Sequence, residues 1–184
     1  MNRNNDGIVV ENEEILLREP TVADEKIIME FKREFEECGS YFAGESGLRD
    51  FDKFEDWFDK VERNKREGTC QEGRVPAFQY LTIRKADGVL VGMINFRPRL
   101  NEFLLKFGGH IGDCVRPTER RRGYATKQIF LVLEIAKKLG LERVLLTCKK
   151  SNVASAKSII KNGGVLENEV DKEGEVMQRY WIEL

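Results

Sequence analysis

The stretch GGHIGDCVRPTERRRGYATKQIFLVLEIAKKL, from Gly108 to Leu139, decides the fold of this chain. A short apolar run ends at Arg116–Pro117, a basic turn follows, and a long apolar segment begins at Ala125. The apolar residues of that segment recur every three or four positions, a spacing that predicts a helix buried against a sheet. The predicted order is therefore strand, basic glycine-containing turn, and helix.

Three consecutive arginines, Arg120, Arg121 and Arg122, stand immediately before Gly123 in this turn. A helix N-terminus presents unpaired N–H groups and about half a positive charge, so further cations are unfavourable there unless an anion is bound. N–H groups and arginines both bind phosphate, and Gly123 has no Cβ to keep the backbone away from it. The turn therefore predicts an anion site, and a solvated surface loop is the alternative interpretation.

Composition indicates a single globular domain over residues 1–184, with residues 1–12 as a flexible N-terminal segment. The chain has 31 basic and 32 acidic residues, a balance that argues against a nucleic-acid partner. It contains no run long enough to span a membrane and no apolar signal-peptide core, so we expect a cytoplasmic protein without a membrane partner. Four cysteines without a C-x-x-C pair and a single histidine predict reduced thiols and no metal site.

Apolar periodicity predicts the remaining elements. Strands are expected at residues 14–18, 77–84, 89–96, 108–115, 143–148, 165–170 and 176–183. Helices are expected at residues 24–37, 51–65, 125–139 and 152–162. The aromatic stripe of the 51–65 helix is expected in the core, with a ligand cage as the alternative. The pattern is that of an α/β fold, a mixed sheet of about seven strands with helices on both faces.

Arg120-x-x-Gly123-x-Ala125, after a strand that ends Val115-Arg116-Pro117, resembles the pyrophosphate-binding signature of the GNAT superfamily of acyl-CoA N-acyltransferases. The resemblance extends from about Glu13 to the C-terminus. It implies a mostly antiparallel sheet whose central parallel pair, 108–115 and 143–148, splays apart to admit the pantetheine arm of acetyl-CoA. The residues that it implies for binding this cofactor are Val115, Arg120, Arg121, Arg122, Gly123, Tyr124, Ala125, Thr126, Asn152 and Ser155.

The implied reaction is transfer of an acetyl group from acetyl-CoA to a primary amine by direct attack in a ternary complex. The acceptor is either a small molecule or a protein or peptide amine. An amine with a pKa near 10 is only about one part in a thousand free base at pH 7, which calls for a general base. His110 is the first candidate, with a structural role as the alternative, and Asp113 is the second. A backbone N–H near Val115 would polarise the thioester oxygen.

Two positions near the last helix leave alternatives open. Asn152 satisfies helix donors as an N-cap, and in the family an asparagine here bonds the CoA arm. Many members carry a tyrosine in this helix as the acid for the leaving thiolate, whereas this chain reads Lys157-Ser158-Ile159, which leaves Ser158 in that place. The missing tyrosine supports the alternative of a CoA-binding sensor or scaffold without turnover. A homodimer is also possible. Nucleic-acid binding by Arg120–Arg122 is the third functional hypothesis, after the acetyltransferase and the CoA-binding sensor or scaffold.

Overall fold

The computed structural model describes residues 8–184, which form one mixed sheet of eight strands flanked by four α-helices. The strands are β1 (Val10–Glu11), β2 (Ile15–Arg18), β3 (Phe78–Arg84), β4 (Leu90–Phe96), β5 (Ile111–Val115), β6 (Arg143–Lys149), β7 (Val165–Lys172) and β8 (Glu175–Glu183). The helices are α1 (Glu25–Glu37), α2 (Phe54–Asn64), α3 (Tyr124–Lys138) and α4 (Val153–Lys161). None of the helices within the described residues has the length and apolar character needed to cross a bilayer.

The strand order is β1-β2-β3-β4-β5-β6-β8-β7, and every neighbouring pair is antiparallel except β5 and β6. The parallel pair is joined through α3, since two parallel strands need a crossover connection. Ile111 and Leu146 are the one residue pair in its register, so the strands separate on either side of that point. The mostly antiparallel sheet with a splayed central pair is therefore confirmed.

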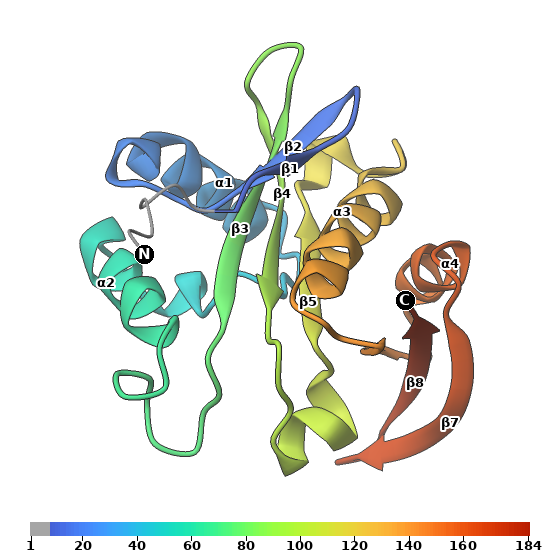
Figure 1. Ribbon diagram of the computed structural model, residues 1–184. Helices are drawn as coiled ribbons and strands as arrows, with labels where there is room; N and C mark the ends of the chain where they lie inside the picture. The colour runs from blue at the N-terminus through green and yellow to red at the C-terminus, as the bar shows by residue number, and fades with distance from the viewer. Residues whose placement is uncertain (1–7) are drawn as a thin grey trace.

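Helices cover both faces of the sheet, as Figure 1 shows, with α1 and α2 on one side and α3 and α4 on the other. Apolar residues of α3 such as Ile129 and Val132 share one core with the facing side of the sheet. Phe31 of α1 and Trp57 of α2 belong to the second core on the opposite face. The aromatic stripe of α2 is therefore core, because Phe54, Trp57 and Val61 are almost fully buried.

Three predicted boundaries were wrong by three residues, and one of them is the start of α2, which lies at Phe54 and not at residue 51. Residues 1–12 were predicted to be flexible, and residues 1–7 lie outside the described residues. Val10 and Glu11, however, form β1, a strand in addition to the seven predicted, and Val10 is only 8% exposed. A two-residue strand is too short to show alternation, which is why the sequence did not reveal it. The strand expected to begin at Gly108 begins at Ile111, because Leu104–Gly108 form a π-helical turn and Gly109 has a φ of 66°.

Candidate active site

A cavity of about 1440 Å³ lies where β5 and β6 separate, and it extends to both faces of the sheet. Its walls come from the loop after α1, from β5 and β6, from the start of α3, and from α4. Ligands of open α/β sheets commonly bind beyond the carboxyl ends of parallel strands, and this cavity has that position. Among the described residues, no cluster of His, Cys, Asp or Glu is suited to hold a metal ion.

Backbone N–H groups of β5 point into this gap. The Arg97 N–H donates to the His110 carbonyl, and the Arg116 N–H donates to the Val91 carbonyl. Within β5, the backbone groups of the even-numbered residues Gly112 and Cys114 therefore face β4. Because bonding directions alternate along a strand, the N–H groups of Asp113 and Val115 face β6, which has already moved away. The predicted donor at Val115 therefore faces the cavity, and Asp113 supplies a second N–H that the sequence analysis did not identify.

The basic turn presents a row of free N–H groups at the start of α3. Arg121 and Gly123 both have left-handed backbone conformations, with φ of 64° and 83°. Within residues 8–184, no hydrogen bond uses the N–H groups of residues 121–126. Helix N-termini with free donors bind phosphate groups, so this row fits the pyrophosphate of acetyl-CoA. Gly123 has room for a side chain, since an added Cβ would meet only Lys127 Cε, at 3.9 Å.

Most of the residues predicted to bind the cofactor line this cavity. They are Val115, Arg120, Arg121, Gly123, Tyr124, Ala125, Thr126, Asn152 and Ser155. Arg122 does not line it, because its guanidinium lies 3.0 Å from the Glu119 carboxylate. The Tyr124 side chain is only 3% exposed and belongs to the core, so this residue presents mainly its backbone.

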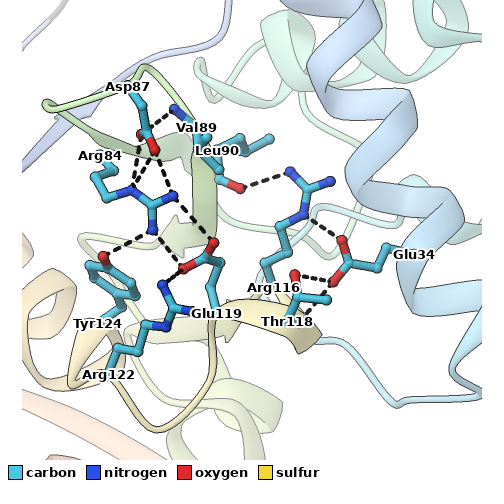
Figure 2. Close-up of polar contacts among 10 residues, drawn as sticks. All are labelled: Glu34, Arg84, Asp87, Val89, Leu90, Arg116, Thr118, Glu119, Arg122 and Tyr124. Carbon is cyan, nitrogen blue, oxygen red and sulfur yellow. Dashed lines mark hydrogen bonds and ion pairs between the residues drawn. The ribbon is translucent and has the colours of Figure 1, made fainter.

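Two ion-pair clusters hold the basic turn in place, as Figure 2 shows. Arg84, at the end of β3, donates to Glu119 at 2.6 Å, to Asp87 at 2.8 Å and to the Tyr124 hydroxyl at 3.2 Å. On the other side of the turn, Glu34 of α1 accepts a hydrogen bond from Arg116 and 2.8 Å bonds from the N–H and hydroxyl of Thr118. The turn is therefore fixed to both β3 and α1 before any ligand arrives.

Asn152 caps α4, and its side-chain oxygen accepts the Ser155 N–H at 3.1 Å. Both residues line the cavity, so the capping role and the predicted ligand role are compatible in this geometry. Ser158 also lines the cavity, one helical turn further on, and its hydroxyl donates to the Ala154 carbonyl at 3.1 Å.

The Asp113 carboxylate lies at the wall of the cavity under α3. Its Oδ2 accepts a 2.9 Å hydrogen bond from Gln128 Nε2, whereas its Oδ1 accepts none from residues 8–184. Burial raises the pKa of Asp113 to about 6, although the Gln128 bond opposes the rise. At neutral pH the group is mostly ionised and has one free oxygen, which is the state that a general base requires.

His110 has different surroundings. The residue is 7% exposed, its Nδ1 accepts the Leu145 N–H at 2.9 Å, and its ring meets Trp181 edge-on at 6.2 Å between centroids. It is not among the residues that line the cavity. Burial lowers the pKa of His110 to about 4. This geometry favours the structural alternative for His110 over the hypothesis of a general base.

Sequence reasoning missed Gln128, which is fully buried in α3. Its amide nitrogen bonds Asp113, and its oxygen accepts the Thr82 hydroxyl at 2.7 Å. The signal was present, because Gln128 lies three residues after Ala125 and four before Val132, both on the apolar line of the helix. A polar residue on such a line calls for a buried partner.

Residues 14–165 match the family model of the GNAT acetyltransferase domain, which is most of the chain. The chain belongs to the GNAT acetyltransferase family. It is therefore an N-acetyltransferase, with acetyl-CoA as the acetyl donor. No curated protein matches the sequence of this GNAT enzyme significantly.

Solved structures share the fold of this GNAT enzyme at low sequence identity. The ribosomal-protein-S5-alanine acetyltransferase from Vibrio fischeri has a TM-score of 0.70 at 16% identity, over 96% of both chains. RimL, a ribosomal L7/L12 α-N-protein acetyltransferase in complex with coenzyme A, has a TM-score of 0.69 at 15% identity, over 96% of this chain and 98% of RimL. A GNAT-family acetyltransferase from Bacillus anthracis has a TM-score of 0.63 at 21% identity, over 96% of this chain and 98% of the Bacillus chain.

Proposed function

We propose that this enzyme transfers the acetyl group of acetyl-CoA to a primary amine by direct attack in a ternary complex, with Asp113 as the general base. The observation that carries the proposal is the position of the free Asp113 oxygen on the same cavity as the unpaired N–H groups of β5. The donor and the acceptor can then enter one cavity from opposite faces of the sheet. No covalent enzyme intermediate is needed.

The β5 backbone supplies the electrostatic part of catalysis. When the amine attacks, negative charge develops on the thioester oxygen, and fixed N–H donors stabilise it at no cost of reorganisation. Asp113 and Val115 each direct an N–H into the gap, so either is placed to donate to that oxygen. Mutational losses for a single donor of this kind are about a hundredfold to a thousandfold in other enzymes.

Proton transfer is assigned to Asp113. The attacking nitrogen becomes strongly acidic once it bonds to the carbonyl carbon, so a carboxylate with a pKa of about 6 is basic enough to accept its proton. The N–C bond forms, the C–S bond breaks, and coenzyme A leaves as a thiolate. A thiol has a pKa of about 8.5, so this leaving group needs little protonation. We therefore propose that Ser158 donates at most a hydrogen bond to the departing sulfur.

The comparisons do not identify the acceptor. Two of the three structures named above are ribosomal-protein acetyltransferases, but at 15% and 16% identity their likeness shows the fold and not the substrate. We propose a primary amine on either a small molecule or a protein or peptide.

Initial-rate kinetics with a thiol-release assay tests the proposal. Acetyl-CoA and a panel of primary amines should give intersecting double-reciprocal plots, whereas parallel plots would indicate an acetylated enzyme intermediate. The alternative of a CoA sensor without turnover predicts that acetyl-CoA raises the melting temperature while no amine releases thiol above the background rate. Asp113→Asn should lose about a hundredfold in kcat/KM while its thermal shift with acetyl-CoA persists.

A further inference from the structure

The acceptor side of the cavity contains an arginine that lacks a carboxylate partner. Arg97 follows β4 and lines the cavity together with Asn95 and Gly112. Alternation along β4 directs Arg97 and Asn95 to the face opposite α3, the face from which an acceptor enters in the proposed reaction. Among the ion pairs within residues 8–184, none involves Arg97.

The contacts of the Arg97 guanidinium are weak. Nη1 lies 3.5 Å from the Gly108 carbonyl and 3.4 Å from the Gly109 carbonyl, at the long limit for hydrogen bonds. Nη2 forms no hydrogen bond with the described residues, and it would lie 3.3 Å from a Cβ placed on Gly112. Burial lowers the pKa of Arg97 to about 10, so the group is still a cation at neutral pH. A half-buried cation without a counter-charge is unfavourable.

A second arginine faces the same part of the cavity. Arg74 lines it, forms no ion pair within the described residues, and its charge contributes to lowering the pKa of Arg97. The loop that carries Arg74 is held beside the end of β4, because Asn101 donates to the Gly73 carbonyl at 2.8 Å. Two guanidinium groups therefore converge on one region of the wall.

The carboxylate within range does not neutralise them. Glu45 acts on Arg97 through space, but one of its oxygens accepts Arg49 Nε at 2.8 Å and the other accepts the Gly47 N–H at 2.7 Å. The polar side chains bonded to Ser46 are neutral. Ser46 Oγ bonds Gln79 at 2.6 Å and Asn95 at 2.9 Å. The net charge left over beside Arg97 is positive.

We propose that Arg97, with Arg74, binds an anionic group of the acceptor, so that the substrate is an amine that also carries a carboxylate or a phosphate. This inference rests on the proposed function and names the substrate class of the same site. Guanidinium groups bind such oxyanions through paired hydrogen bonds. Nη2 lies against Gly112, the residue before Asp113 in β5. Alternation along β5 directs the Asp113 carboxylate to the opposite face of the sheet, so the acceptor would reach from Arg97 through the gap between β5 and β6 to Asp113.

The first experiment needs no turnover. With the enzyme saturated by acetyl-CoA, so that the cofactor's own phosphate sites are filled, inorganic phosphate is titrated against chloride at equal ionic strength and the melting temperature is recorded. Phosphate should stabilise the wild type and should have less than a third of that effect on Arg97→Met and on Arg74→Gln. Arg99→Gln is the matched control, because Arg99 is an exposed neighbour paired with Glu67 at 2.6 Å and does not line the cavity.

The second experiment identifies the source of the anion. Thiol release is measured with Ala-Asp-Ala-amide against Ala-Asn-Ala-amide, and with alanine against alaninamide. The wild type should prefer the anionic member of at least one pair by about tenfold or more in kcat/KM, and Arg97→Met should abolish that preference. A preference in the first pair indicates an acidic peptide, and one in the second indicates a free amino acid.

Two results would overturn the inference. One is equal stabilisation of the wild type and Arg97→Met by phosphate. The other is turnover of both pairs with no preference for the anion. Arg74 is exposed, so its variant folds whatever the state of Arg97→Met. If no amine is acetylated at all, the proposed function fails while the phosphate titration still decides whether the anion subsite exists.

Discussion

Gln128 Nε2 donates to Asp113 Oδ2 at 2.9 Å, and this bond links the buried face of α3 to the wall of the cavity. The same amide bonds the Thr82 hydroxyl and the Cys114 carbonyl, so its orientation is fixed from three directions. The carboxylate is thereby held with Oδ1 free. The reactivity proposed for Asp113 depends on this arrangement.

Asp113→Asn should flatten the acidic limb of the kcat/KM profile. Burial raises the pKa of Asp113 to about 6, so in the wild type the base form is lost as the pH falls below that value. A group whose folded pKa is raised costs stability when it ionises, and that cost appears as the pH rises from about 4 to about 6. The free energy of unfolding of Asp113→Asn, relative to that of the wild type, should therefore be higher at pH 8 than at pH 4 by on the order of 3 kcal/mol. Rate profiles and thermal melts at both pH values test this, and a retained inflection near pH 6 would exclude Asp113 as the base.

Gln128→Leu should move that limb to higher pH. The Gln128 hydrogen bond favours the ionised form of Asp113, so its loss raises the carboxyl pKa further. The control is Thr82→Val, which removes the hydroxyl that donates to the Gln128 oxygen and leaves the bond between Gln128 and Asp113 in place. Both variants should lose about 1–3 kcal/mol of stability through an unpaired buried group, but only Gln128→Leu should shift the profile. Identical profiles for the two variants would contradict the positioning role of Gln128.

His110→Ala should lower stability by about 1–3 kcal/mol, because it leaves the buried Leu145 N–H without its acceptor. The inflection of the kcat/KM profile should stay near pH 6. The pKa of His110 is lowered by burial to about 4, so the folded protein resists protonation and loses stability as the pH falls from about 6.5 toward 4. The variant should lack this acid-induced loss. Removal of the inflection by this variant would restore His110 to the mechanism.

Gly123→Ala should weaken the stabilisation by acetyl-CoA. At a hundredfold excess over its dissociation constant, acetyl-CoA adds about 2.7 kcal/mol to the wild type, which corresponds to roughly 5–10 °C in melting temperature. Gly140→Ala is the matched control, since Gly140 has a φ of 81° at the opposite end of α3, against 83° for Gly123. Both variants carry the same backbone strain, of about 1–2 kcal/mol. Only Gly123→Ala should lose the ligand-dependent shift, and equal shifts would move the pyrophosphate site elsewhere.

Arg121→Gln should weaken acetyl-CoA binding by about tenfold, whereas Arg122→Gln should leave it nearly unchanged. The two substitutions are chemically identical at adjacent positions, but Arg121 lines the cavity and Arg122 pairs with Glu119 outside it. Calorimetric titration at two salt concentrations measures the difference. Equal losses would mean that the turn acts through its overall charge and not through the placement of individual side chains.

Much of the fold was predictable because it depends on local patterns. The periodic apolar lines gave the α-helices, and the Asp87-Gly88 turn between apolar runs gave the β3–β4 hairpin. The turn before α3 was also predictable, since it stands between an apolar strand and an apolar helix, although its residues alone also fit a solvated loop. The family implied the splayed pair, but no local pattern shows where β5 and β6 separate.

The chemistry of the site was less accessible to sequence reasoning. The π-helical turn of residues 104–108 delays the start of β5 to Ile111. His110 therefore precedes the strand and does not line the cavity, whereas Asp113 belongs to the strand and does. The direction of Arg122 depends on Glu119, which in turn is held by Arg84 from a distant strand. Arg97 gave no signal in the sequence, because an arginine after a strand is usually solvated. Its significance comes from the missing partner, which only the three-dimensional arrangement reveals.

The single residue pair between β5 and β6 makes this sheet two sub-sheets that meet at a seam, β1 to β5 on one side and β6, β8 and β7 on the other. Along the seam, each half exposes a strand edge to the interior of the cavity. The pantetheine arm of acetyl-CoA is extended and has its own amide groups, so it can form hydrogen bonds to both strand edges, as a further strand would. Bound acetyl-CoA would then add to the cohesion that the shared core around α3 already gives the two halves.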